Sequence, residues 1–368
     1  MKQGRFSKVV KIGGFSHVRS IQIGGNYPVV VQTMWKDRLT LNELEDAAKR
    51  VEALGDMGCG LLRFAVPNID AAEVLGRLSE MVSMPLVADI HFDYKIALRC
   101  MNFPIAKIRI NPGNIGTNEK VRIVLEKAAI RGIPIRIGVN AGSLPLDLRQ
   151  RVDEGMSTSE ALAQAALREI SIFEDFGFTD YLVSMKASGI ADTISTARFL
   201  SERTDAPLHI GVTEAGPLTA GVVRNTAALL PLLTEGLGDT IRVSLSDTME
   251  NEVIAGREII AAAAQLSPDN ERLHFQGVNI VSCPRCGRHG FDTHGFTNRW
   301  MSRLYALKKR VTVAIMGCEV NGPLEAKHAD LGITGAGDKI LIFRHGEIIK
   351  TISAVEADAA FEEELGKL

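Results

Sequence analysis

Hydrophobic and polar positions follow a repeating order along the first two thirds of the chain. Short β-branched runs, which predict buried strands, alternate with longer runs whose apolar residues have helical spacing. The predicted strands are Val29–Gln32, Leu61–Val66, Leu86–Ile90, Lys107–Ile110, Ile135–Val139, Tyr181–Met185, Leu208–Val212 and Thr240–Leu245. The helices expected between them include Leu41–Leu54, Ala71–Val82, Glu119–Arg131, Thr158–Phe176, Ile190–Arg203, Thr219–Leu233 and Glu252–Ala264. After a hairpin-like lead, Val9–Ile12 and Val18–Ile23, this order predicts an α/β protein with an N-terminal (β/α)8 TIM-type barrel. A doubly wound open sheet is the alternative fold.

The pattern changes near Ser267-Pro268-Asp269-Asn270, which is a plausible linker. We therefore expect a barrel domain at residues 1–268 and a smaller α+β domain at residues 269–368. Its predicted elements are strands Gly277–Val281 and Val311–Met316, a helix at about Asn298–Lys309, a hairpin of Lys339–Arg344 and Glu347–Ile352, and a closing acidic helix.

Cations interrupt several of the predicted barrel strands. Four strand segments place an arginine between two apolar residues: Leu62-Arg63-Phe64, Ile108-Arg109-Ile110, Ile135-Arg136-Ile137 and Ile241-Arg242-Val243. Alternation turns the apolar neighbours outward and the arginine inward, near the strand ends where barrel enzymes have their active sites. Lys186 follows its strand in the same manner, and Asp89 and His91 end another.

Burying this much positive charge is costly unless an anion compensates it, and guanidinium groups match phosphate oxygens. The barrel mouth is therefore predicted to bind a substrate with more than one phosphate. Polar residues on the same rim are Asn111, Asn140, Thr213, Glu214 and Ser244. Glu214 is the carboxylate best placed for proton transfer, although it could instead pair with an arginine. The glycine-rich segment Asn111–Gly116 is either a phosphate cradle or a plain turn.

Three cysteines follow the apolar runs of the second domain: Cys283 and Cys286 in a Cys-x-x-Cys pair, and Cys318. Three thiolates suit an iron–sulfur cluster whose fourth iron takes another ligand, whereas structural zinc prefers four ligands. A zinc site completed by His289 or His294 stays open at this point. The segment Gly332–Gly337 is interpreted as a tight loop covering the metal.

Composition narrows the class of protein. The chain has 368 residues, is 46% hydrophobic and has a formal net charge of −2, which argues against nucleic acid or an anionic membrane as the main partner. No apolar run is long enough to span a bilayer, and Met1–Arg5 lacks the apolar segment of a signal peptide. We expect a cytoplasmic protein. Five cysteines, an odd number, argue against a disulfide framework, and Cys59 and Cys100 are predicted to be buried structural thiols.

The motifs Cys-Pro-x-Cys-Gly-Arg at Cys283–Arg288 and Gly-Cys-x-Val-Asn-Gly-Pro-x-Glu-Ala at Gly317–Ala326 resemble those of the 4-hydroxy-3-methylbut-2-enyl diphosphate synthase family. The segments Lys107–Gly116, Pro134–Asn140, Ala88–Phe92 and Gly211–Gly216 are also similar to this family, so the resemblance covers nearly the whole chain. Members are iron–sulfur enzymes of the non-mevalonate isoprenoid pathway.

The resemblance implies a role for each site residue. Cys283, Cys286, Cys318 and Glu325 would ligate a [4Fe–4S] cluster. The diphosphate of 2-C-methyl-D-erythritol 2,4-cyclodiphosphate would be bound by Arg63, Asp89, His91, Arg109, Asn111, Arg136, Asn140, Lys186, Thr213, Arg242 and Ser244. Glu214 would donate a proton, Glu325 would also act in catalysis, and a ferredoxin or flavodoxin would supply two electrons. The family also implies a head-to-tail homodimer.

Two departures from the family pattern stand out. Leu324 occupies a position that is usually glycine, where a positive φ would be costly. Trp35–Arg38 replaces residues that are commonly small and polar. The rival function is a barrel enzyme for phosphate substrates with a structural zinc domain; a macromolecule-binding zinc-ribbon module is disfavoured by the near-neutral charge.

Overall fold

A computed structural model describes residues 6–140, 142, 144–273, 277–284 and 286–368, apart from the side chains of Asn140 and Asn321. The chain divides into two units, residues 1–275 and 276–368. The predicted boundary after residue 268 lies slightly earlier. Arg272 belongs to the first unit, because it donates hydrogen bonds to Gly236 O (2.8 Å) and Gly238 O (3.0 Å) and pairs with Asp239 (2.7 Å).

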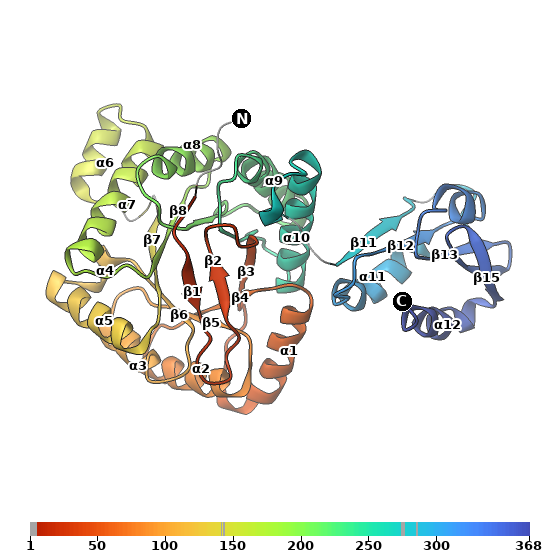
Figure 1. Ribbon diagram of the computed structural model, residues 1–368, viewed down its shortest axis with the longest axis horizontal. Helices are drawn as coiled ribbons and strands as arrows, with labels where there is room; N and C mark the ends of the chain where they lie inside the picture. Colours follow the sequence, from red (N-terminus) through yellow and green to blue (C-terminus); the bar gives the residue numbers. More distant parts are fainter. Residues whose placement is uncertain (1–5, 141, 143, 274–276, 285) are drawn as a thin grey trace. The chain divides into compact units, whose positions relative to one another are not determined.

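The first unit is a closed barrel of parallel strands in the order β10-β3-β4-β5-β6-β7-β8-β9, with helices around the outside (Figure 1). The strands are β3 (Val30–Met34), β4 (Leu61–Ala65), β5 (Leu86–Asp89), β6 (Lys107–Ile110), β7 (Ile135–Asn140), β8 (Tyr181–Lys186), β9 (Leu208–Ile210) and β10 (Thr240–Ile241). Every residue of β5, β6 and β8 is buried, as expected of parallel strands covered on both faces. The predicted TIM-type barrel is confirmed.

The barrel helices are α1 (Leu44–Asp56), α2 (Ile69–Met81), α3 (Tyr94–Cys100), α4 (Pro112–Ile115), α5 (Asn118–Arg131), α6 (Leu146–Asp153), α7 (Thr158–Asp175), α8 (Ile190–Ser201), α9 (Leu218–Thr234) and α10 (Met249–Leu266). Short 3-10 turns occur at Leu41–Glu43 and Glu271–Leu273. Side-chain caps fix several starts: Asn68 accepts from Ala71 N at α2, and Thr248 accepts from Asn251 N at α10. The short helices α3, α4 and α6 lie outside the predicted set.

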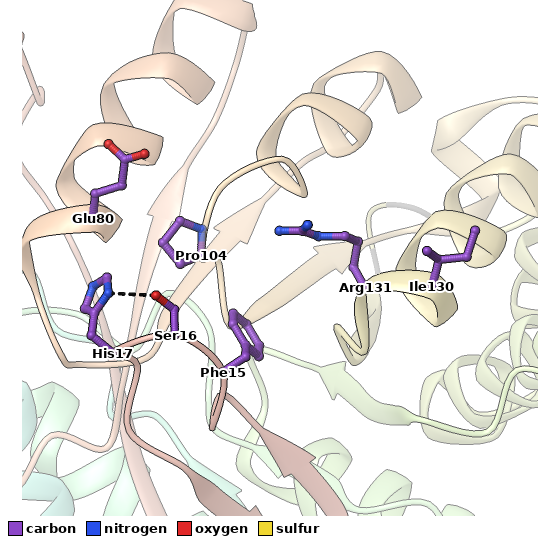
Figure 2. Close-up of a pocket in the computed structure, with 7 residues that line it drawn as sticks. All are labelled: Phe15, Ser16, His17, Glu80, Pro104, Ile130 and Arg131. Carbon is purple, nitrogen blue, oxygen red and sulfur yellow. Dashed lines mark hydrogen bonds between the residues drawn. The ribbon is translucent and has the colours of Figure 1, made fainter.

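The lead hairpin closes the N-terminal end of the barrel. Strands β1 (Val10–Ile12) and β2 (Ile21–Ile23) pair antiparallel, and their apolar side chains pack against the starts of barrel strands, among them Leu61 and Val87. A pocket of about 580 Å³ opens at this end (Figure 2). Its lining residues are Phe15, Ser16, His17, Glu80, Pro104, Ile130 and Arg131. It lies at the opposite end from the cationic residues described below, where barrel side chains serve stability.

The second unit is built on a five-stranded mixed sheet in the order β11-β12-β13-β14-β15. Strands β11 (Val278–Ser282), β12 (Val311–Met316) and β13 (Leu331–Ala336) are parallel, and β14 (Lys339–Arg344) and β15 (Glu347–Ile352) continue antiparallel. The helical elements are α11 (Thr293–Tyr305), a π-helix at Val320–Glu325, a 3-10 turn at Ala354–Glu356 and α12 (Ala357–Leu365). The predicted α+β class and the hairpin around His345-Gly346 are confirmed.

Two predictions in this unit are wrong. The segment Gly332–Gly337 is not a loop, since most of it belongs to β13 at the centre of the sheet. Its glycines are needed because a Cβ at Gly332 would lie 2.0 Å from the ring of Phe343, and one at Gly335 would lie 2.4 Å from the backbone of Gly290. Helix α11 begins at Thr293 rather than near residue 298, because the Asp292 side chain caps it by accepting from Gly295 N.

Among the residues that the structure describes, no helix has the length and apolar character needed to cross a membrane.

Candidate active site

The predicted cationic side chains gather inside the barrel; most lie toward the carboxyl ends of their strands, whereas Arg136 is the second residue of β7. They are Arg63 on β4, Arg109 on β6, Arg136 on β7, Lys186 at the end of β8 and Arg242 just after β10. All are largely buried, and Arg136 is only 1% exposed. The apolar neighbours of each arginine pack outward, as alternation requires.

Asp89, at the end of β5, is the anion nearest the centre of this cluster. Its carboxylate accepts from Arg109 Nη1 at 3.1 Å and lies 3.5 Å from both Arg63 Nε and His91 Nε2. Burial opposes ionisation of Asp89, but the hydrogen bond with His91 and the charges of Arg63, Arg109 and Arg136 hold its pKa well below its usual range. The predicted pair Asp89 and His91 is therefore part of the cationic cluster.

Gly138 allows Arg109 to lie flat against β7. A Cβ at Gly138 would stand 2.3 Å from Arg109 Nε, so any side chain there would displace the guanidinium. Arg109 Nη2 also donates to the carbonyl of Gly138 at 3.3 Å. This close approach explains why glycine interrupts an otherwise apolar strand.

The cluster carries more positive charge than its acids neutralise. Burial and the neighbouring cations lower the pKa of Arg136 and Lys186 well below their usual values, and burial lowers that of Arg63 to about 10. Nε and Nη1 of Arg136 donate to no acceptor in the described part of the chain. A buried cation without acceptors is expensive, so this arrangement fits a site that receives an anion.

Sequence reasoning missed several members of the cluster. Lys107, two residues before Arg109 on the same face of β6, donates to Gln32 Oε1 at 3.4 Å, and His209 on β9 contacts Thr240 Oγ1 at 2.7 Å through Nδ1. Leu208-His209-Ile210 has the same alternation of a polar residue between two apolar ones as the arginine segments and could have been found by it. Glu252 of α10 is 1% exposed and accepts hydrogen bonds from Arg242. An acidic residue in the first turn of a helix is common, so the sequence did not indicate that this one points into the barrel.

The remaining rim residues are less closely connected. Asn111 is buried directly after β6, and Thr213 N donates to Ala187 O at 3.2 Å. Ser244 follows Arg242 by two residues, and the side chain of Asn140 lies outside the described residues. Glu214 is exposed and accepts from Ser188 Oγ at 3.5 Å, so it does not pair with an arginine in the described structure.

Glu214 has a backbone φ of 54°, which is unusual for a residue with a side chain. Such strain persists where the surrounding structure fixes the conformation, and it is concentrated at functional sites. Leu324, by contrast, is not among the described residues with positive φ, and its side chain is 70% exposed. Leu324 therefore does not adopt the positive φ that would be costly there.

In the second unit, backbone hydrogen bonds bring the three cysteine-bearing segments together. Cys283 follows β11 and its N–H donates to Ile315 O of β12 at 3.0 Å, so it lies beside the strand that leads to Cys318. Gly290 N donates to Gly317 O at 2.8 Å, which ties the loop containing Cys286 to the same place. A Cβ at Gly317 would lie 3.7 Å from Cys283 Sγ, so the Gly317 backbone passes close to this thiol.

Glu325 ends a π-helix that begins just after Cys318. Gly322 N donates to Cys318 O at 2.9 Å, which links this helix to the cysteine, and π-helices are frequent at functional sites. Across the described ranges, no three His, Cys, Asp or Glu side chains are close enough to hold one metal ion. A cluster of several irons is larger than one ion, so its ligands need not converge on a single point.

Comparison with known proteins decides the family. The family model described as the GcpE TIM-barrel domain matches residues 15–257, and that of the GcpE protein C-terminal domain matches residues 279–367. The chain belongs to the GcpE family. GcpE family enzymes are iron–sulfur proteins.

Relatives match the chain over 95–100% of its length. A protein of Treponema denticola named 4-hydroxy-3-methylbut-2-en-1-yl diphosphate synthase (flavodoxin) is 46% identical over 395 residues, covering 100% of both chains. Proteins with the same name from Treponema pallidum (47% identical; 97% of this chain and 91% of that protein) and Thermodesulfovibrio yellowstonii (42% identical; 95% and 97%) are also similar. The family resemblance read from the motifs is confirmed.

Proposed function

We propose that the chain reduces 2-C-methyl-D-erythritol 2,4-cyclodiphosphate to (E)-4-hydroxy-3-methylbut-2-enyl diphosphate in the non-mevalonate isoprenoid pathway. The observation that carries the proposal is the excess of buried positive charge at the carboxyl ends of the barrel strands. Family membership of both domains supplies the substrate and the reaction. The reaction takes two electrons and a proton, breaks a ring C–O bond and releases a hydroxyl as water.

The diphosphate would be bound by the arginine cluster. Arg63, Arg109, Arg136, Lys186 and Arg242 supply the charge, with His91, Asn111, Asn140, Thr213 and Ser244 on the rim. Asp89 would orient Arg63 and Arg109 rather than touch the phosphates, because like charges repel. The unused N–H groups of Arg136 support this assignment, since phosphate oxygens are the acceptors that guanidinium groups match best.

The second unit would hold a [4Fe–4S] cluster through Cys283, Cys286, Cys318 and Glu325. Three thiols on adjoining segments fit such a cluster, and a carboxylate is a harder and more exchangeable ligand than a thiolate. When bound, the cluster supplies the electrons one at a time, and the names of the relatives favour flavodoxin over ferredoxin as the donor.

Glu214 is proposed as the proton donor. It is an exposed carboxyl next to the cationic mouth, and its strained backbone supports a role beyond structure. The family resemblance further supports a cytoplasmic head-to-tail homodimer, which sedimentation of the purified chain would test.

Anaerobic purification tests the proposal. The full-length chain should contain iron and sulfide and should turn over the cyclic diphosphate when reduced flavodoxin is supplied. Glu325→Ala should keep much of its iron and lose most turnover, whereas Glu319→Ala, an exposed neighbour, should keep both. A preparation that contains only zinc at the thiols would overturn the assignment.

A further inference from the structure

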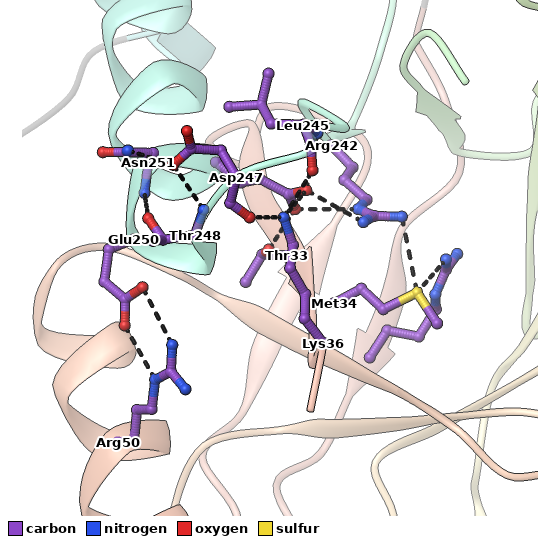
Figure 3. Close-up of polar contacts among 12 residues, drawn as sticks. Thr33, Met34, Lys36, Arg50, Arg242, Leu245, Asp247, Thr248, Glu250 and Asn251 are labelled. Atoms are coloured by element: carbon purple, nitrogen blue, oxygen red, sulfur yellow. Dashed lines mark hydrogen bonds and ion pairs between the residues drawn. The ribbon is translucent and has the colours of Figure 1, made fainter. Parts of the chain in front are cut away.

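The barrel closes at a seam between its first and last strands. Strands β3 and β10 pair only at Val30–Thr240 and Val31–Ile241. Beyond that point the chain carries Arg242 and Ser244 toward the mouth without pairing to β3. Lys36, in the segment after β3, contacts this part of the chain (Figure 3).

Lys36 makes the links across the seam. Its Nζ donates to the carbonyl oxygens of Leu245, at 2.8 Å, and of Asp247, and lies 3.0 Å from Glu252 Oε1. These acceptors belong to the loop after β10 and to the first turn of α10. One side chain thus connects β3 to the segment that follows Arg242.

Glu252 is shared between Lys36 and Arg242. Arg242 donates to both carboxylate oxygens, each at 3.2 Å, Thr33 Oγ1 donates at 2.5 Å, and Leu245 N donates at 3.0 Å. Burial raises the pKa of Glu252, but Arg242 and these hydrogen bonds outweigh it, so the carboxyl is ionised. One negative charge faces two cations, and the group keeps a net positive charge.

We propose that Lys36 is a positioning residue for diphosphate binding: it offsets Glu252 so that the charge of Arg242 stays available to the substrate. The inference rests on the proposed function. Without Lys36, the bidentate Arg242–Glu252 pair would be electrically neutral, and the loop at Leu245–Asp247 would lose its anchors.

The thioether of Met34 contacts the Arg242 guanidinium without neutralising its charge. Met34 Sδ accepts from Arg63 Nη2 at 2.7 Å and lies 3.7 Å from Arg242 Nη1, so an uncharged thioether stands between two guanidinium groups. Both arginines can therefore point toward one anion.

The segment that carries Lys36 is itself clamped. Trp35 stacks on Phe64 with ring centroids 5.3 Å apart, and the Arg50 guanidinium lies 5.5 Å from the Trp35 ring. Arg50 also pairs with Asp37 at 2.8 Å and Glu250 at 3.1 Å. These contacts give Trp35–Arg38, where the family usually has small polar residues, a physical role at the barrel seam.

A calorimetric titration of the full chain with inorganic pyrophosphate tests the proposal independently of the iron content. Lys36→Met should weaken pyrophosphate binding by roughly tenfold at low salt and by less at high salt, because one nearby charge is lost. Lys36→Arg should restore most of the affinity. Lys49→Met, which removes an exposed lysine of α1 that pairs with Asp46, should bind like wild type. In turnover assays Lys36→Met should raise KM and leave kcat nearly unchanged.

The possible results distinguish a failure of the role proposed for Lys36 from a failure of the proposed function. Wild-type affinity in Lys36→Met, with or without a lower Tm, would overturn the role of Lys36 and leave the proposed function standing. A failure of wild type itself to bind pyrophosphate would instead overturn the phosphate site. Equal losses in Lys36→Met and Lys36→Arg would show that the charge of residue 36 is not what matters.

Discussion

Arg136 shows at the scale of one residue how binding and stability conflict at this site. It is buried at the centre of like charges, and burial together with Arg63 and Arg109 depresses its pKa. Part of its guanidinium lacks acceptors in the described structure. A fold selected only for stability would place an apolar side chain here. The cation is explained by the anion that it is proposed to bind.

Replacing Arg136 with Met should therefore raise stability and reduce binding. We expect the free energy of unfolding without ligand to rise by roughly 1–3 kcal/mol, because an unpaired buried charge is removed at similar volume. Pyrophosphate should no longer stabilise the variant, as denaturant unfolding with and without the ligand would reveal. Arg272→Met is the matched control: both Nη groups of this buried arginine donate to Asp239 and two carbonyls, so its loss should destabilise. An Arg136→Met protein that is less stable and still binds pyrophosphate would contradict this account.

At the scale of elements, the loop after β6 depends on a neighbouring helix. Glu169 of α7 accepts from the backbone N–H of Gly113 in α4, and a Cβ at Gly113 would lie 3.2 Å from Glu169 Oε1. Burial raises the pKa of Glu169 to about 7, and the hydrogen bond from Gly113 only partly offsets it. The segment Asn111–Gly116 is thus held from behind by a carboxyl that titrates near neutrality.

This shift predicts how stability changes with pH. Because the folded pKa lies above the ordinary value of 4.5, the folded state holds the proton more tightly, and stability falls as pH rises from about 5 to 8. Allowing for solvent screening of a partly exposed group, the loss should be about 1–2 kcal/mol. Glu169→Gln should flatten this part of the unfolding profile, whereas Glu45→Gln, at an exposed position of α1, should keep the wild-type slope. Identical slopes in all three proteins would rule out Glu169 as the source.

Strand β13 offers a second prediction at this scale. A Cβ at Gly335 would meet the backbone of Gly290, in the loop that ties Cys286 to Gly317. Gly335→Ala should destabilise the second unit by roughly 1–3 kcal/mol, because the backbone of Gly290 cannot move aside as easily as a flexible side chain. The displaced loop should also lower the iron content. Gly337→Asn is the control, because that position has a φ of 61° and no atom within 4 Å of a Cβ. Iron analysis and thermal unfolding of both variants would decide, and normal iron in Gly335→Ala would refute the expectation.

The sequence predicts the barrel strands well and strand β13 poorly, for physical reasons. Barrel strands are short buried runs with strong β propensity, so all eight were found within a few residues of their ends. Strand β13 was missed because its glycines, required by close contacts with Phe343 and Gly290, resemble a loop. The need for glycine at these positions comes from packing between segments that are distant in the sequence, so the local sequence pattern does not reveal it.

The same limit applies to the candidate site. Arginines between apolar neighbours could be placed inside the barrel from alternation alone, as Arg63 and Arg109 illustrate. The pairing of Glu252 with Arg242 and Lys36 joins α10, β10 and β3, whose relation depends on how the barrel closes. The position of Glu214 on the rim suggested a proton donor from the residues themselves, whereas the proposed role of Glu325 came from the family resemblance alone, since one carboxyl at a loop resembles many others.

At the scale of the whole molecule, the two units have separate cores and separate candidate chemistry. The barrel carries the cations proposed to bind the diphosphate, and the second unit carries Cys283, Cys286 and Cys318. The described residues include two further thiols, Cys59 and Cys100, which are buried in the barrel unit, and burial raises the pKa of each to about 12. A thiol that stays protonated is a poor metal ligand.

Iron loading and anion binding should therefore be separable by mutation. Cys283→Ala should lose most iron and sulfide, while its pyrophosphate affinity stays within about twofold of wild type, a free-energy change well under 1 kcal/mol. Cys100→Ala should keep its iron and lose only a little stability through a small cavity. Iron and sulfide analysis beside calorimetry with pyrophosphate measures both quantities on the same preparations. A Cys283→Ala protein that keeps its iron would remove this residue from the ligand set, and one that loses pyrophosphate binding along with iron would show that the barrel site depends on the cluster-bearing unit.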